Sequence, residues 1–256
     1  PADFMVDSYD LEFNFRNDLN AVATIKTDDF KDEYKFTLYH GYKISKITDG
    51  NNDELNFTRD SDYLTIKNTS KSKLIKIYYH GSCDKYYSNY LSVFLPGNFA
   101  FYPIPGFNEM YSTHSYAGFD DLSLPYETDF NVTVHSLKKV QCNLESSTNN
   151  EFKGKSDSLT LLSGFINCVT INKTQIYYPY FNDAYNSNTI NEKLETFVSK
   201  NPNIKKIFII PDINLEDIEF VKKEFYEVLK NIVENYEKGI DLDNNNIYLD
   251  NDGLIV

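Results

Sequence analysis

Tyr9-Asp10-Leu11-Glu12-Phe13-Asn14-Phe15 decides the fold, because large apolar side chains alternate in it with polar ones. A period of two places the apolar side chains on one face of a strand and the polar side chains on the other. The stretch therefore predicts a β-strand with one buried face.

The same alternation returns through most of the chain. Further strands are predicted at residues 19–27, 34–38, 55–57, 63–66, 74–78, 130–134, 159–162, 165–171 and 175–178. Short strands at near-regular spacing are typical of a sandwich or barrel rather than of βαβ units. We expect a mainly β protein, an antiparallel sandwich or saddle-like sheet, over residues 1–180.

The period changes near residue 180. Thr189 and Glu192 have the spacing of a capping box, so we expect a short helix from there to about Lys200. A buried strand is predicted at residues 207–210, followed by an amphipathic helix over residues 215–238. Residues 181–256 are therefore predicted to form a small α/β segment.

Composition limits the partners. The 256 residues carry a net charge of −13, and no run of the sequence clusters Lys and Arg, so nucleic acid is not expected as a partner. No stretch reaches the roughly 20 apolar residues of a membrane span, so we expect no direct membrane insertion by this segment. A start without Met and an end on Leu254-Ile255-Val256, just after a turn signal, suggest a piece of a longer protein.

A proline-bearing stretch, Phe101-Tyr102-Pro103-Ile104-Pro105-Gly106-Phe107, is predicted to be an ordered loop over a sheet edge. Tyrosines flank it, and aromatic groups with a polar tip suit sugar or peptide recognition. Packing in a sandwich core is the favoured role of these tyrosines. The candidate binding residues of an aromatic loop surface are Tyr102, Phe107 and Tyr111.

No complete catalytic motif occurs in the sequence, so we do not expect this chain to be an enzyme. HExxH is absent, and His40, His80, His114 and His135 are isolated, as expected of structural or exposed histidines. Cys83, Cys142 and Cys168 are too scattered for a disulfide framework or a metal site, and we expect them to be buried.

One stretch has the spacing of a calcium loop. Asp241, Asp243 and Asn245 fall at its first, third and fifth positions, and Asp252 at its twelfth. Leu249 offers no side-chain oxygen at the ninth position, and no clear second helix follows. A polar loop, a strand and a turn are favoured over a calcium site, so no cofactor is expected in this chain.

The order of segments resembles a known family. Tyr63–Ile66 and Leu74–Gly81 precede the proline-bearing stretch, and Asp129–Val134 and Lys139–Leu144 follow it. This order resembles the N-terminal, saddle-like β-domain of gluzincin aminopeptidases, the aminopeptidase N family. It looks closest to the extracytoplasmic aminopeptidase-like domains of bacterial ABC-transporter permeases.

The resemblance implies a second, thermolysin-like domain that carries the zinc ligands, the catalytic Glu and a substrate-binding Gly-x-Met-Glu-Asn strand. Residues 189–256 look like the start of such a domain. Asn251-Asp252-Gly253-Leu254 does not reproduce the substrate-binding motif, and HExxH does not occur, so no catalytic residue of the family carries over.

Three functions therefore stay open. The first is a non-catalytic, extracytoplasmic interaction or substrate-sensing domain at the cell surface. It would be tethered through a parent membrane protein of the permease type, and its partner would be the rest of that protein or another extracytoplasmic protein or peptide. The second is the N-terminal part of a zinc aminopeptidase, with zinc bound only by a following catalytic domain. The third is a surface sandwich that binds glycans or proteins.

Overall fold

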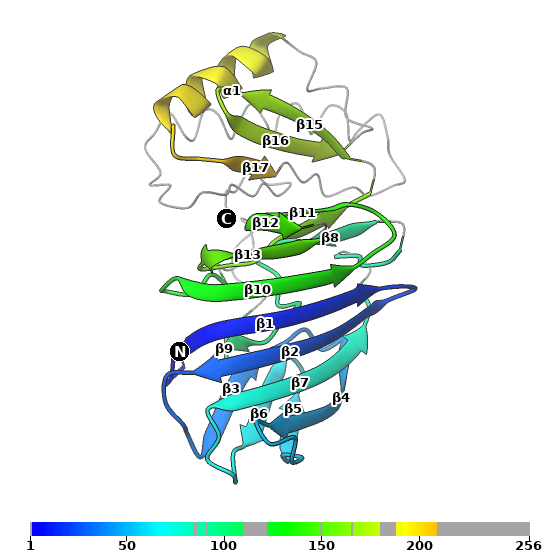
Figure 1. Ribbon diagram of the computed structural model, residues 1–256, viewed down its shortest axis with the longest axis vertical. Coiled ribbons are helices and arrows are strands. Elements are labelled where there is room, and N and C mark those ends of the chain that lie inside the picture. The colour runs from blue at the N-terminus through cyan, green and yellow to red at the C-terminus, as the bar shows by residue number, and fades with distance from the viewer. Residues whose placement is uncertain are drawn as a thin grey trace. The chain divides into compact units, whose positions relative to one another are not determined.

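The chain forms two compact units whose boundary lies at Gly164. The computed structural model describes residues 2–83, 86–90, 92–109, 122–148, 150–164, 166–179 and 188–208. Within these residues the first unit holds three β-sheets, and the second holds one small sheet and one helix (Figure 1). The predicted mainly β fold is confirmed.

Seven strands form the largest sheet, and every neighbouring pair in it is antiparallel except β1 and β10, which run parallel. The order across the sheet is β12 (Glu145–Thr148), β13 (Glu151–Ser156), β10 (Thr128–His135), β1 (Val6–Phe15), β2 (Leu19–Thr27), β7 (Leu74–Gly81) and β4 (Tyr42–Asp49).

The alternation that opened the sequence sets which face of this sheet is buried. Tyr9, Leu11 and Phe13 are at most 1% exposed, while Asp10 and Glu12 between them are exposed. A one-residue slip in register would turn every apolar side chain of the strand toward water, so the buried face fixes the register.

Two smaller sheets complete the first unit. The four-stranded sheet has the order β5 (Phe57–Asp60), β6 (Tyr63–Lys67), β3 (Glu33–Thr37) and β9 (Ile104–Pro105). The three-stranded sheet has the order β11 (Val140–Cys142), β14 (Leu161–Ser163) and β8 (Val93–Leu95).

Aromatic side chains join the sheets of the first unit. Phe4, just before β1, meets Tyr34 and Phe36 of β3 edge-on, with ring centroids 5.0 and 5.4 Å apart. Phe13 of β1 lies 5.6 Å from Phe101. Such pairs add to the free energy gained by burying the rings. Buried aromatic side chains therefore contribute much of the core of this unit.

The proline-bearing stretch is buried inside this core rather than laid over it. The Tyr9 hydroxyl donates a hydrogen bond to the Pro103 carbonyl, and the Tyr79 hydroxyl donates one to the Phe101 carbonyl, each at 2.8 Å. Ile104 and Pro105 then pair with β3 and extend that sheet at its edge. The predicted loop at a sheet edge is therefore partly an edge strand.

The second unit contains β15 (Ile166–Ile171), β16 (Thr174–Pro179), α1 (Asn188–Lys200) and β17 (Lys206–Phe208). We placed the change of architecture near residue 180, but β16 pairs in parallel with β17, which assigns the β15–β16 hairpin to this unit. The contact boundary therefore lies at Gly164. The helix predicted over residues 215–238 lies outside the described residues, and so does the end of the strand predicted at residues 207–210.

Two further observations concern the described residues of both units. No described helix has the length and apolar character needed to cross a membrane. Cys83 and Cys142 are buried as expected, whereas Cys168 is exposed, because it lies on β15 at a position that faces solvent.

We expect the Tyr79 hydroxyl to stabilise the first unit. Tyr79→Phe leaves the buried Phe101 carbonyl without its donor, which costs about 1–3 kcal/mol in the free energy of unfolding. Tyr78→Phe is the matched control, because Tyr78 points to the solvent face of the same strand and the change there costs at most about 0.5 kcal/mol. Urea unfolding followed by circular dichroism measures both; equal losses would contradict the assigned role.

The turn after β4 is organised by one carboxylate. The Oδ1 atom of Asp49 accepts hydrogen bonds from the backbone N–H groups of Asn51 (2.8 Å) and Asp53 (3.0 Å). The Ser70 side chain lowers the pKa of Asp49 from its ordinary value of 3.8 most strongly, burial opposes the shift, and the two backbone N–H groups add to the lowering. The carboxylate thus holds the backbone of the turn at residues 49–53.

This lowered pKa gives the stability a defined pH dependence. The ionised Asp49 stabilises the folded state above its ordinary pKa of 3.8, and the contribution disappears as the pH falls through the lower folded-state pKa. Asp49→Asn should therefore be less stable than the parent chain at pH 7, and the difference should shrink below pH 3.8. Asp53→Asn, an exposed change in the same turn, serves as the control. A difference that stays constant down to low pH would contradict the prediction.

Candidate functional site

The predicted aromatic surface is corrected at its central residue. Tyr102 is 0% exposed and packs edge-on against Tyr9 and Phe130, with ring centroids 5.4 and 5.9 Å away. The hydrogen bonds that draw the flanking carbonyls into the core also bury this ring. Tyr102 thus has the packing role and cannot contribute to a binding surface.

Phe107 does lie at the surface, where 41% of it is exposed. Its ring stacks on Tyr63 of β6 with centroids 4.7 Å apart, and the Lys35 ammonium lies 5.7 Å from the ring centre. Neither Tyr63 nor Lys35 was among the candidates predicted from the sequence. They reach Phe107 only through the pairing of β3, β6 and β9, which no local pattern reveals.

The backbone around Phe107 is fixed on both sides. The Gly106 N–H donates to the Lys35 carbonyl, and the Thr37 hydroxyl donates to the Gly106 carbonyl, both at 2.8 Å. The Asn108 N–H donates to that hydroxyl, also at 2.8 Å. Gly106 has φ of 89°, a conformation that glycine adopts without steric cost. The exposed ring is therefore held in one position before any ligand arrives, which lowers the entropic cost of binding.

The other candidates cannot be placed. Tyr111 and the calcium-loop residues Asp241, Asp243 and Asn245 lie outside the described residues. Among the described residues, no three His, Cys, Asp or Glu side chains gather where they could hold a metal ion.

Buried tyrosines near the sheet are not acid–base groups. Burial raises the pKa of Tyr9, Tyr42 and Tyr79 well above 10.0. Their hydroxyls therefore stay protonated at neutral pH. Those of Tyr9 and Tyr79 donate hydrogen bonds in the core.

Each described histidine has an acidic neighbour. His40 Nδ1 lies 2.8 Å from Asp62, and His135 Nε2 lies 2.9 Å from Glu12. His80 is 4.0 Å from the Asp18 carboxylate. The three pairs are separate and partly exposed, so the described histidines do not form one site.

Arg59 anchors the connection between β3 and β4. Its Nη2 atom donates to the carbonyls of Leu38 (2.7 Å) and Tyr39 (2.6 Å), and its Nε atom donates to Ser61 (2.9 Å). Its Nη1 atom donates to the Tyr42 carbonyl. Burial lowers the pKa of this guanidinium while nearby Asp62 raises it. One planar cation thereby bonds to carbonyls of the β3–β4 connection and of the turn between β5 and β6.

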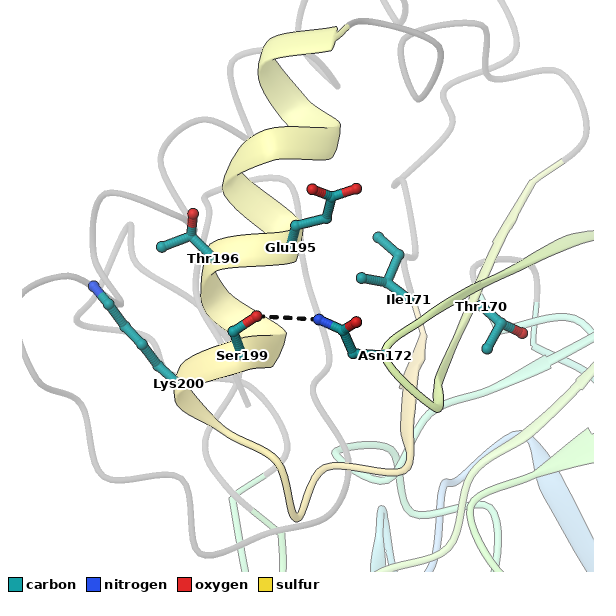
Figure 2. A pocket seen from close by; sticks show the side chains of 7 residues that line it. All are labelled: Thr170, Ile171, Asn172, Glu195, Thr196, Ser199 and Lys200. Carbon is teal, nitrogen blue, oxygen red and sulfur yellow. Dashed lines mark hydrogen bonds between the residues drawn. The ribbon is translucent and has the colours of Figure 1, made fainter.

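The second unit contains a hollow of about 810 Å³ between the β15–β16 turn and α1 (Figure 2). Its lining residues are Thr170, Ile171, Asn172, Glu195, Thr196, Ser199 and Lys200. The Asn172 amide donates to the Ser199 hydroxyl at 3.1 Å and ties the turn to the helix. The hollow offers hydrogen-bonding groups to a polar ligand, and its lining residues include no histidine or cysteine.

This chain is similar to known proteins in its fold and not in its sequence. No protein-family model and no curated protein matches the chain. An aminopeptidase N family protein from Idiomarina loihiensis is similar in structure, with a TM-score of 0.52 and 11% identity over 79% of this chain and 38% of that one. The fold is aminopeptidase-like.

Yeast LTA4 hydrolase in complex with bestatin is similar to the same degree. The TM-score is 0.52 and the identity 13%, over 81% of this chain and 37% of that protein. The chain thus spans less than two fifths of the length of these two structures. At such identities the likeness shows the fold alone, and it agrees with the resemblance to the aminopeptidase N-terminal domain.

Replacing Arg59 tests the anchor. Arg59→Lys cannot reach four carbonyls with one ammonium, and each buried carbonyl left without a donor costs about 1–3 kcal/mol. We expect a clear loss in the free energy of unfolding measured with urea. Arg16→Lys changes the only other arginine of the chain, an exposed one, and should leave that free energy within about 0.5 kcal/mol. Equal stability of the two variants would contradict the anchoring role.

Proposed function

We propose that this chain is a non-catalytic, aminopeptidase-like domain that acts as an extracytoplasmic interaction or substrate-sensing module of a membrane protein. The observation that carries the proposal is the aminopeptidase-like fold over about four fifths of the chain. The order of strands around the proline-bearing stretch supports the finer part, a parent protein of the ABC-transporter permease type.

The chemistry of the chain supports a role in binding. HExxH does not occur in its 256 residues, so the two histidine ligands of that motif are not supplied by this chain. The polar groups in the hollow of the second unit can hydrogen-bond a ligand, and Phe107 presents a fixed aromatic ring at the surface. Both features serve recognition without requiring a chemical step.

The second candidate function is that of the N-terminal part of an active zinc aminopeptidase. It is favoured by the short span of the chain against its structural neighbours, which it covers to 37–38%. The parent gene decides between the two. An HExxH downstream, followed by a more distant Glu, would establish the enzyme, and their absence would exclude it.

The proposal predicts no aminopeptidase activity in this chain. The purified chain, incubated with aminoacyl fluorogenic substrates and added zinc, should release fluorophore no faster than buffer does. An active zinc aminopeptidase, assayed in parallel with and without a chelator, controls for the substrates. Hydrolysis by the chain that a chelator abolishes and zinc restores would overturn the proposal.

A further inference from the structure

The outer face of the seven-stranded sheet separates charges by strand. On the three neighbouring strands β2, β7 and β4, it carries Lys26, Lys43, Lys46 and Lys76. Asp49 is the only acidic residue in these strands, and it is buried at the end of β4. We call the four lysines the basic patch.

Strand register brings these lysines together. Lys43 lies opposite His80, and Lys46 lies opposite Tyr78, across the β4–β7 pair. Lys76 of β7 faces Thr24 of β2. Neighbouring strands are about 4.8 Å apart and residues rise by about 3.3 Å, so the patch covers roughly 10 by 20 Å. The three strands lie side by side at one end of the sheet (Figure 1).

The patch has no internal neutralisation. None of its four lysines forms an ion pair with a described residue, whereas Lys155 on β13 pairs with Asp129 at 3.8 Å. Lys46 instead lies over the Tyr78 ring, 4.5 Å from its centre, and Lys76 makes only a long contact of 3.4 Å with the Asn52 amide oxygen. In a chain of net charge −13, this face is locally positive.

The adjoining strands carry the opposite sign. Asp7, Asp10 and Glu12 are exposed along β1, and Asp129 is exposed on β10. The positive face therefore ends where β2 meets β1. An anionic partner that stays within β2, β7 and β4 meets the four lysines, with the Asp18 carboxylate beside His80 at one end of β7. One that extends across β1 meets the carboxylates of Asp10 and Glu12.

We propose that the basic patch docks a short acidic segment of a partner protein. The inference rests on the proposed interaction function and names its surface and the chemistry of its partner. Several carboxylates of one peptide can reach the four ammonium groups at once. Half-buried Val22, Thr24 and Tyr78 between the lysines supply apolar and hydrogen-bonding contact.

The size of the patch favours a peptide over a larger polyanion. A bilayer surface or a nucleic acid presents negative charge over a much wider area than the patch. It would bring that charge against the carboxylates of β1 and β10, and like charges in close contact disfavour association. A segment of a few acidic residues fits within the positive area.

Fluorescence anisotropy with labelled hexaglutamate tests the proposal on the full chain. We expect saturable binding that weakens as the salt concentration rises from about 20 to about 150 mM, because exposed charges are screened. Hexaglutamine of the same length should not bind. The double variant Lys26→Glu/Lys76→Glu should weaken hexaglutamate binding at least about tenfold.

The matched control changes two lysines on the same face of the same sheet. Lys153→Glu/Lys155→Glu on β13 alters the net charge equally and should change hexaglutamate binding less than about twofold. Circular dichroism shows whether both variants fold, and the neutral pair Lys26→Gln/Lys76→Gln should weaken binding to an intermediate degree. An equal loss of hexaglutamate affinity in the two glutamate double variants would contradict the assignment of binding to the basic patch.

Two further outcomes would overturn the inference. Absence of hexaglutamate binding would exclude the basic patch as a docking site. The peptidase assay on the same preparation tests the proposed non-catalytic role independently of that result. Tighter binding to phosphatidylserine vesicles or duplex DNA, lost in Lys26→Glu/Lys76→Glu, would overturn the choice of a protein partner.

Discussion

Two hydrogen bonds from buried tyrosine hydroxyls hold the first unit in its arrangement. The carbonyls of Phe101 and Pro103 lie in the core, where an unsatisfied acceptor costs free energy, and they belong to a stretch whose prolines have no N–H group to donate. Tyr79 and Tyr9 supply the missing donors from the seven-stranded sheet. Burial raises the pKa of both hydroxyls and so keeps them protonated. The buried carbonyls therefore keep their hydrogen-bond donors. Tyr102 is buried as a consequence.

Much of this fold could be predicted because its central strands bury only one face. The alternation in β1 and β2 predicts their extent to within a few residues, and the capping box places α1 correctly. β12 and β13 were not predicted, since all four side chains of β12 are exposed and leave no alternation to detect. The change of architecture predicted near residue 180 differs from the boundary at Gly164 for a related reason. β15 and β16 alternate like the strands of the first unit, but the strand that pairs with them, β17, follows only after the helix.

The candidate site was less predictable, because its contacts depend on register rather than on local sequence. Arg59 meets Leu38 and Tyr42 across a strand connection, and Phe107 meets Tyr63 through the pairing of β9 with β3. The sequence indicated that aromatic side chains of the proline-bearing stretch either pack in the core or form a binding surface. It could not separate a ring in the core, such as Tyr102, from one at the surface, because both belong to the same short stretch.

The basic patch could not be predicted from the sequence, although the period of two in the same strands made the fold predictable. Lys26, Lys43 and Lys76 are dispersed in the sequence among apolar residues, and they gather only when three strands pair. Net charge is a poor guide to such a surface. At physiological ionic strength the screening length is about 8 Å, so a bound segment responds to the lysines it touches more than to acidic residues farther away. A chain of net charge −13 can therefore present a site for an acidic partner, provided that the partner stays clear of Asp10 and Glu12.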